Sequence, residues 1–407
     1  MSLALTTAIF VLSYLLIAVR RVPWLPLGRT SGALLGAVLM VVSGALSPEQ
    51  AYAAIDHDTL ALLLGMMLIT GFYERLGLFE RIAQSILQTA RSPFHLLVAL
   101  SATAALGSAF LVNDTICLFL TPVVLSTCRN ARLPLGPFLI ALATSANIGS
   151  AATLVGNPQN MIIGGLSQIS FTRFASVSAP VAFMALCLNI GLLWAYYNQR
   201  LPAVLPAVER MPSRPWPDLA VPTIAITALV VVAFFCGFHL GFTALAGALA
   251  LMILDRKDPT PLLAKVDGSL LLFFAGLFVV VEGMNKTGLV ETLWNEVEPW
   301  LTLTTPVGVS VFAAAVTTGS NLVSNVPLVL LAAPHVADMG EAAWILLAYV
   351  ATLAGNLTLV GSVANLIVAE GAKQEYELGF VEYLRFGAVS TLLTIAAGTP
   401  LLLALAR

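Results

Sequence analysis

Long apolar stretches without a charged residue alternate with short charged segments along the whole chain. The uncharged stretches are Thr30–Pro48, Leu133–Thr172, Phe174–Gln199, Leu219–Leu254, Pro299–Ala337, Ala342–Ala369 and Phe386–Ala406. A helix needs about 20 mostly apolar residues to cross a lipid bilayer, and most of these stretches are that long or longer. The pattern therefore predicts an all-α polytopic membrane protein.

The composition strengthens this prediction. The chain has 407 residues, of which 59% are hydrophobic and 10% are charged, and its mean hydropathy is +0.94. Soluble domains carry about 25% charged residues, so the composition excludes a soluble fold. We expect the lipid bilayer as the surroundings and no nucleic acid as a partner. The four cysteines and four histidines are scattered singly, which predicts no thiolate or imidazole metal site and no bound cofactor.

The two halves of the sequence repeat one another. At a constant offset of 211 residues, "GLFE" at Gly77–Glu80 matches "GLVE", and "LVNDTICLFLTP" from Leu111 matches "LVSNVPLVLLAA". The motif "TLVG" at Thr153–Gly156 returns at an offset of 205 residues. This alignment pairs Asp114 with Asn325. Several matches in the same order predict an internal duplication.

Each repeat is predicted to contain five spanning helices, one of them broken, and a re-entrant hairpin. The predicted parts are a first repeat at 1–198 (hairpin about 92–127, broken helix about 133–171), a cytoplasmic linker at 199–217, and a second repeat at 218–407 (hairpin about 305–336, broken helix about 342–368). Because five is odd, the second repeat has inverted topology. With this topology 16 of the 19 Lys and Arg residues lie on one face, which the positive-inside rule assigns to the cytoplasm. Both termini are then expected on the non-cytoplasmic side of the inner membrane.

Four polar motifs interrupt the apolar segments at membrane depth. They are "VNDTI", "SANIGSAATLVGNPQN", "GSNLVSNVP" and "AGNLTLVGSVAN". Glycine and proline release backbone groups from the helix ladder; freed carbonyls and Asn oxygens can bind Na⁺, and the ends of half-helices suit an anion. The asparagines Asn147, Asn157, Asn160, Asn356 and Asn365 have an alternative role as hydrogen-bonding contacts between helices. Because the motifs repeat with matched glycines, we favour one shared binding site. Inverted repeats with discontinuous helices are typical of secondary transporters.

Asp114 is the only carboxylate in a predicted hairpin tip. An ionised carboxylate at membrane depth is unfavourable by about 2.5–3.5 kcal/mol unless it is paired or hydrated. Asp114 therefore binds a cation, exchanges a proton, or caps the following half-helix. The chain has no H-E-x-x-H motif, no G-x-S-x-G motif and no paired membrane carboxylates, so we do not expect an enzyme.

At these motifs the sequence resembles the ion-transporter superfamily, which includes arsenical permeases, citrate and other carboxylate carriers, sodium/proton antiporters and the melanocyte P protein. "NDTICLFLTPVVL" and "SNLVSNVPLVLL" resemble the two hairpin motifs of the arsenical permease and P-protein branch. "SANIGSAATLVGNPQNMIIG" is similar to that branch's broken-helix pattern. Dicarboxylate/sodium symporters carry Ser-Asn-Thr at the hairpin tips, and this chain has Asn-Asp-Thr and Ser-Asn-Val instead.

The resemblance implies an elevator-type secondary carrier, usually a homodimer, for a small anion or oxyanion (arsenite-like, or a carboxylate) coupled to H⁺ or Na⁺. An alternative is a Na⁺/H⁺ antiporter that uses Asp114 as the exchanging carboxylate. By motif position, the substrate- and ion-binding residues are Asn113, Asp114, Thr115, Asn147, Gly156, Asn157, Asn160, Ser324, Asn325, Asn356, Gly361 and Asn365. Na⁺ is expected at Asn113, Asn160, Asn325 and Asn365.

Overall fold

The computed structural model describes residues 3–18, 28–202, 205 and 216–407. Within these residues every regular element is a helix, and there is no β-strand. The predicted linker at 199–217 falls mostly on residues 203–204 and 206–215, which lie outside the described residues.

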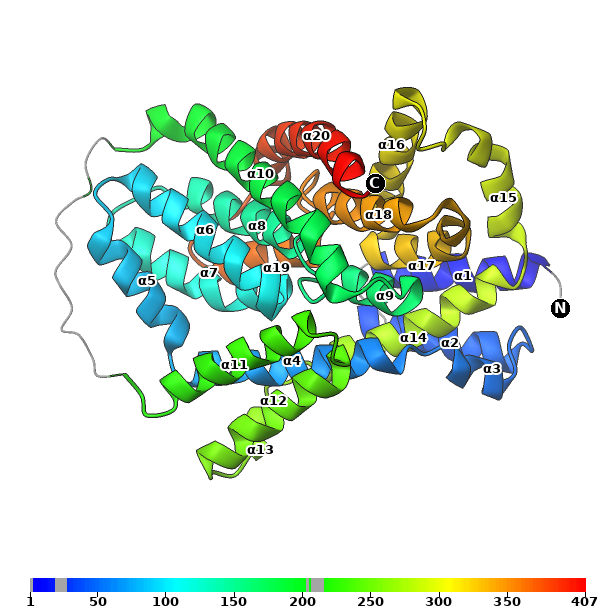
Figure 1. The fold of residues 1–407 in the computed structure, drawn as a ribbon, viewed down its shortest axis with the longest axis horizontal. Coiled ribbons are helices and arrows are strands. Elements are labelled where there is room, and N and C mark those ends of the chain that lie inside the picture. The colour runs from blue at the N-terminus through cyan, green and yellow to red at the C-terminus, as the bar shows by residue number, and fades with distance from the viewer. Residues whose placement is uncertain (1–2, 19–27, 203–204, 206–215) are drawn as a thin grey trace.

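The helices follow one another in the same order in the two halves. The first half contains α1 (Leu3–Ala18), α2 (Arg29–Val42), α3 (Pro48–Ala53), α4 (His57–Arg75), α5 (Leu78–Thr89), α6 (Pro93–Leu111), α7 (Asn113–Asn130), α8 (Leu135–Ser150), α9 (Pro158–Ser167) and α10 (Phe171–Tyr197). The second half contains α11 (Ala220–Phe235), α12 (Leu240–Asp255), α13 (Thr260–Leu263), α14 (Gly268–Asn285), α15 (Leu289–Val297), α16 (Pro306–Val323), α17 (Asn325–Val336), α18 (Glu341–Ala354), α19 (Val363–Ala372) and α20 (Phe380–Leu405). In Figure 1, α5–α7 lie toward one end of the molecule and α15 and α16 toward the other.

The helix contacts also repeat when the halves are exchanged. Helix α4 packs on α12 as α14 packs on α2, and α7 packs on α19 as α17 packs on α9. Two glycines let these helix pairs pack closely in the same way. A Cβ added to Gly65 would lie 2.7 Å from the Ala244 backbone, and a Cβ added to Gly276 would lie 2.9 Å from the Ala33 backbone. Such reciprocal contacts are what a pseudo-two-fold axis between the halves produces. The inverted orientation of the second half in the membrane stays a prediction.

The segments predicted as hairpins and broken helices each divide into two helices. Helices α6 and α7 pack against each other, and a single residue separates them along the chain. The same is true of α16 and α17. The segment predicted as the first broken helix divides into α8 and α9, and the second divides into α18 and α19. Both breaks occur at the glycine-rich motifs, where the backbone no longer forms the regular hydrogen bonds of an α-helix.

Helices α8 and α18 form the centre of the molecule. Every residue of α8 from Gly136 to Ser150, and every residue of α18 from Ala343 to Ala354, is buried. A helix that is apolar on all sides needs neighbours on all sides. Here α6, α7, α10, α16, α17 and α20 supply them, with α10 and α20 side by side along the top of Figure 1. The polar ends of α8 and α18 are thereby placed inside the protein.

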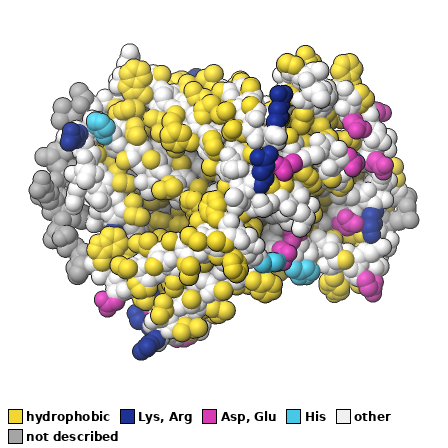
Figure 2. Space-filling view, in the orientation of Figure 1, with side chains coloured by type: hydrophobic (Ala, Val, Ile, Leu, Met, Phe, Trp, Pro, Cys, Tyr) yellow, Lys and Arg dark blue, Asp and Glu magenta, His cyan; other side chains and the backbone are white. Residues whose placement is uncertain are grey.

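The apolar exterior agrees with a multi-pass membrane protein. Among the described residues, five helical segments are long and apolar enough to cross a membrane by themselves: Pro93–Leu111, Phe171–Arg200, Gly268–Asn285, Pro306–Val323 and Phe380–Leu405. Shorter apolar helices accompany them. Hydrophobic side chains predominate on the face shown in Figure 2, and charged ones are sparse there. The predicted total of ten crossings remains a prediction.

Candidate transport site

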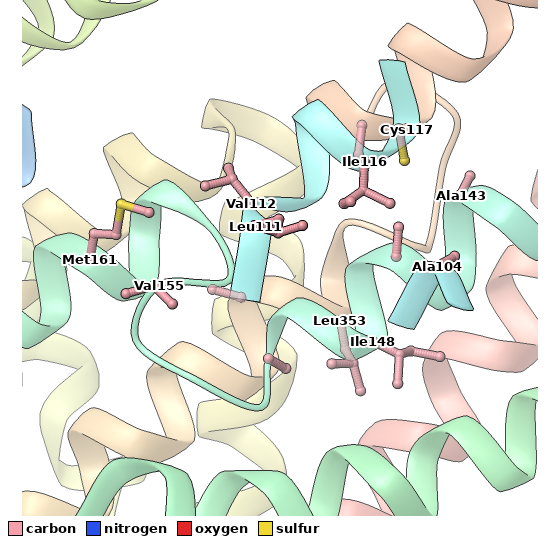
Figure 3. Packing of buried hydrophobic residues seen from close by; sticks show 14 of the residues in the cluster. Ala104, Leu111, Val112, Ile116, Cys117, Ala143, Ile148, Val155, Met161 and Leu353 are labelled. Atoms are coloured by element: carbon pink, nitrogen blue, oxygen red, sulfur yellow. The ribbon is translucent and has the colours of Figure 1, made fainter. Parts of the chain in front are cut away.

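Each hairpin reverses at one residue in a left-handed backbone conformation. Val112 has φ 69° and Ser324 has φ 73°, a region that residues other than glycine seldom adopt and that stores strain when they do. The second arm then begins at Asn113 in the first hairpin and at Asn325 in the second. Figure 3 shows Leu111 and Val112 at the first tip, packed among buried side chains of the broken helix such as Val155.

This geometry corrects the predicted pairing of Asp114 with Asn325. The tips superpose at an offset of 212 residues, the difference between 113 and 325, so Asn113 is the counterpart of Asn325 and Asp114 that of Val326. The arms agree: a Cβ on Gly107 would lie 2.9 Å from Ile116, and one on Gly319 would lie 2.7 Å from Leu328. Asp114 therefore has an apolar counterpart, and the two tips differ in polarity at this position more than the sequence alignment indicated.

The two broken helices are built by the same hydrogen bonds. Asn160 Nδ2 donates to the carbonyl oxygens of Ser150 (3.2 Å) and Thr153 (2.9 Å). Asn365 Nδ2 donates to those of Gly355 (2.7 Å) and Thr358 (3.0 Å), each partner displaced by 205 residues. These amides satisfy carbonyl groups that the helix break releases, so both asparagines hold their loops in shape.

The second half-helices begin with equivalent caps. Asn157 Oδ1 accepts from the Asn160 backbone N–H at 2.8 Å, and Ser362 Oγ accepts from the Ala364 backbone N–H at 3.3 Å. Asn and Ser are preferred at this position because their oxygens satisfy a free N–H of the first turn. Asn157 therefore has a structural role in starting α9, whatever else it contacts.

Asn147, at the C-terminal end of α8, joins the two halves. Its Nδ2 donates to Asn356 Oδ1 (2.8 Å) and Asn365 Oδ1 (3.0 Å). Its Oδ1 accepts from Asn113 Nδ2 (2.9 Å) and Ser362 Oγ (3.1 Å). One side chain thus connects the first hairpin tip to the second broken helix, and it is 1% exposed.

Thr352 occupies the position equivalent to Asn147 in α18. Its Oγ1 accepts from Asn157 Nδ2 (3.1 Å) and Gln159 Nε2 (3.2 Å) and lies 3.5 Å from Asn160 Oδ1. The contact between halves is therefore made twice, once around an amide and once around a hydroxyl. Sequence reasoning missed Thr352 and Gln159, although the offset of 205 from Asn147 was a signal for the former.

Gly156 and Gly361 bring the broken helices close to their surroundings. The Gly156 carbonyl oxygen accepts from the Asn113 backbone N–H at 2.9 Å, which ties the first tip to the first loop. A Cβ would lie 2.1 Å from the Ser150 carbonyl oxygen at Gly156, and 2.7 Å from Asn321 Oδ1 at Gly361. No side chain larger than hydrogen fits at Gly156 without a shift of the backbone.

The remaining predicted residues lie at the tips and are less fully engaged. Asp114 and Thr115 are half-buried in the first turn of α7, and Asp114 forms no ion pair with any residue that the structure describes. Asn325 is 8% exposed, and among the described residues its Oδ1 has no hydrogen-bond partner. Ser324 lies at the surface of a cleft. The structure thus gathers the two tips and both broken helices into one polar region.

A cleft of about 500 Å³ reaches the second hairpin tip. Its polar lining includes Ser320, Asn321, Ser324 and the cationic side chain of Arg29, and its apolar lining comes mainly from α1, α16 and α19. Asn321, which the predicted site did not include, accepts from Thr358 Oγ1 at 3.0 Å and donates to the Ala354 carbonyl oxygen at 3.0 Å. A small solute can therefore approach the second tip along α1.

Comparison with known proteins decides the family. The family model described as citrate transporter matches residues 14–354. The chain belongs to the citrate transporter family. It is 36% identical to the silicon efflux transporter LSI3 of Oryza sativa subsp. japonica, over 94% of this chain and 93% of that protein. It is 32% identical to the transporter arsB of Dictyostelium discoideum, over 99% of this chain and 92% of that protein.

More distant similarities agree with this. The P protein of Sus scrofa is 28% identical over 88% of this chain and 55% of that protein. The crystal structure of the Alcanivorax borkumensis YdaH transporter aligns with 99% of this chain and 97% of its own, with a TM-score of 0.55 and 15% identity, which shows the all-helical membrane-transporter fold. The resemblance based on the hairpin and broken-helix motifs is confirmed, and the chain is a multi-pass membrane transporter of this family.

Proposed function

We propose that the protein is a secondary active transporter for a small weak oxyacid of the arsenite or silicate kind, coupled to protons through Asp114. The observation that carries this proposal is the chemistry of the site. Amides and hydroxyls from both halves converge there, the four motifs contain no Lys or Arg, and Asp114 is their only ionisable group.

A site of this kind suits an uncharged solute with several hydroxyl groups. Arsenous and silicic acids are neutral near pH 7 and offer O–H donors and oxygen acceptors, which asparagine and serine side chains can match. Two relatives that cover most of the chain are named as a silicon efflux transporter and as arsB. A citrate-like carboxylate fits less well, because a buried multivalent anion needs opposite charge.

Coupling to a proton follows from the position of Asp114. An ionised carboxylate at membrane depth is unfavourable by about 2.5–3.5 kcal/mol unless it is neutralised or hydrated. Asp114 makes no direct ion pair with a described residue, and the charge of Arg29 attracts it only through space. A proton supplies the neutralising charge in one state and can leave in the other. Exchange of a proton for the oxyacid then links transport to the pH gradient.

Na⁺ is the alternative coupling ion. Among the asparagines expected to bind it, Asn113, Asn160 and Asn365 already use their side-chain oxygens as acceptors within the protein. Only Asn325 Oδ1 is without a partner in the described residues. This distribution favours H⁺ over Na⁺. A Na⁺/H⁺ antiporter that exchanges on Asp114 remains the second candidate, and it requires ion exchange with no oxyacid present.

An elevator movement is the mechanism we propose. Helices α1, α2, α4, α11, α12 and α14 pack mainly on one another, and the hairpins, broken helices, α10 and α20 form a second group. Few contacts, such as α4 with α9 and α14 with α17, join the two groups. The second group can therefore slide against the first as a unit. A homodimer in the inner membrane with external termini is the accompanying expectation.

The experiment that tests this function is uptake into liposomes that contain the purified protein. Arsenite, silicic acid, citrate and succinate are compared with and without Na⁺ and with and without a pH gradient. We expect uptake of the two oxyacids, driven by the pH gradient and indifferent to Na⁺. Uptake of citrate alone, or a strict need for Na⁺, contradicts the proposal. Na⁺-dependent proton movement without any added solute supports the antiporter instead.

A further inference from the structure

A second buried polar cluster lies behind the predicted site, where α10 and α20 pack beside α8. Its centre is Asn189 of α10, which is 0% exposed. Asn189 Nδ2 donates to Thr144 Oγ1 (3.0 Å) and Ser145 Oγ (3.3 Å), and its Oδ1 accepts from Ser390 Oγ of α20 (2.7 Å). No motif of the sequence analysis contains Asn189, and it belongs to neither hairpin nor broken helix.

This cluster is continuous with the site through one turn of α8. The Thr144 carbonyl oxygen accepts from Asn356 Nδ2 at 3.1 Å, and Asn356 Oδ1 accepts from Asn147 at 2.8 Å. Asn147 in turn accepts from Asn113, the residue beside Asp114. A path of side-chain and backbone hydrogen bonds therefore runs from the α10–α20 contact to the first hairpin tip.

We propose that Asn189 is a positioning residue for the transport site. It fixes the turn of α8 that carries Thr144, and that turn sets where the amide of Asn356 and then Asn147 can lie. Buried polar groups of this kind fix a geometry only when all their partners are present, and Asn189 uses both donor and acceptor atoms. The proposal rests on the proposed function for its transport readout.

In the second half the equivalent contact, between α18 and α20, is made mainly by one bulky side chain. Tyr349 is the counterpart of Thr144 at the offset of 205. Its hydroxyl donates to the Thr394 carbonyl oxygen at 2.7 Å, and a Cβ on Gly398 of α20 would lie 2.0 Å from that hydroxyl. A bulky side chain against a glycine thus holds α18 to α20.

Thr391 Oγ1 of α20 donates to the Leu353 carbonyl oxygen at 3.4 Å. That oxygen accepts from the backbone N–H of Asn356 and not from its side chain. In the first half the turn held by Asn189 bonds the side chain of Asn356, which argues that Asn189 does more than pack.

Three variants separate positioning from packing. Asn189→Leu keeps the branched shape of the side chain and removes all three hydrogen bonds, and Ser390→Ala removes one of them. Tyr349→Phe is the matched control, because it removes one equally buried hydrogen bond from the equivalent place in the other half. None of these three residues lies in the proposed binding set.

The test is arsenite uptake into liposomes with each purified variant. We expect Asn189→Leu to raise KM about tenfold and Ser390→Ala about threefold, with Vmax per folded protein changed less than about twofold. Tyr349→Phe should leave KM unchanged. If Asn189→Leu alters only the yield of folded protein or Vmax, or if Tyr349→Phe shifts KM equally, the residue is merely structural and the proposal is wrong.

Hydrogen–deuterium exchange tests the same claim without a substrate. Exchange in residues 111–116 and 352–365 should be faster in Asn189→Leu and Ser390→Ala than in wild type, and unchanged in Tyr349→Phe. Equal exchange in all four proteins overturns the proposal. If wild-type protein fails to transport arsenite while exchange changes as expected, the proposed function fails and the positioning role stands.

Discussion

Asn147 of α8 and Asn365 of α19 are joined across the two halves of the chain by a hydrogen bond of 3.0 Å. The equivalent residues Thr352 and Asn160 approach each other at 3.5 Å. The two broken helices therefore touch at their breaks, each through the other half's asparagine. This contact defines the centre of the proposed site, because the first hairpin tip also reaches it through Asn113.

Replacement of Asn147 by alanine should abolish transport and lower thermal stability. The change leaves buried groups of Asn113, Asn356, Asn365 and Ser362 without their partner, and each unsatisfied group costs about 1–3 kcal/mol. We expect the melting temperature in detergent to fall by several degrees. Asn130→Ala, at an exposed position, is the control and should change nothing measurable. A fully active Asn147→Ala protein contradicts the assignment of the centre.

Gly156→Ala should reduce transport and thermal stability as strongly as Asn147→Ala. A Cβ there would lie 2.1 Å from the Ser150 carbonyl oxygen, so Gly156→Ala must displace the loop that holds the Asn113 backbone. We expect loss of arsenite uptake and a lower melting temperature. Gly191→Ala is the matched control, since no atom lies within 4 Å of the added group. Replacing a helical glycine there should stabilise by about 0.5–1 kcal/mol.

The ion pair between Arg75 and Asp255 should stabilise the contact between α4 and α12. The two groups are 2.5 Å apart, and the Asp255 side chain is only 3% exposed. Arg75→Met leaves a buried carboxylate unpaired, which destabilises by about 3–5 kcal/mol. Lys373→Met removes an exposed pair with Glu370, and surface pairs contribute about 0–1 kcal/mol. Thermal unfolding of the two variants should differ accordingly, and equal melting temperatures contradict this ranking.

The predicted orientation can be tested at the C-terminal end of α20. Arg173 at the start of α10 donates to the Ala406 carbonyl oxygen at 2.9 Å, so these two helix ends lie on the same face of the protein. That face is predicted to be non-cytoplasmic. Alkaline phosphatase fused after Arg407 should be active in cells, and the same enzyme inserted after Lys257 should be inactive. The opposite result reverses the topology without changing the site.

The positions where the apolar helices stop could be predicted because they depend on local composition. Glycine, proline and asparagine mark the places where an apolar helix stops, and the same stops recur at fixed offsets. The register of the hairpins could not be predicted. Between Gly77 and Asn113 the first half has 35 residues, and between Gly288 and Asn325 the second half has 36. A mostly apolar segment gives no sign of one added residue, and that residue moves the counterpart of Asp114 from Asn325 to Val326.

The partners of the asparagines also depended on the three-dimensional structure. Asn160 and Asn365 are predicted to bind Na⁺, which stays a prediction, and the structure adds that their amides donate to loop carbonyls within their own halves. Asn147 was expected at the site, and its four partners come from two helices, a loop and a helix cap. Contacts between the two halves depend on how the helices pack in three dimensions, and the spacing of residues along the chain does not reveal this packing.

The most direct test of the central claim is proton movement during arsenite transport by wild-type protein and by Asp114→Asn. Liposomes that contain a pH-sensitive dye receive arsenite under an imposed pH gradient. We predict that wild type couples arsenite movement to an opposite movement of protons, and that Asp114→Asn shows neither proton movement nor dependence on the gradient. Coupled transport by Asp114→Asn at the wild-type rate, or transport by wild type that ignores the pH gradient, would contradict the account.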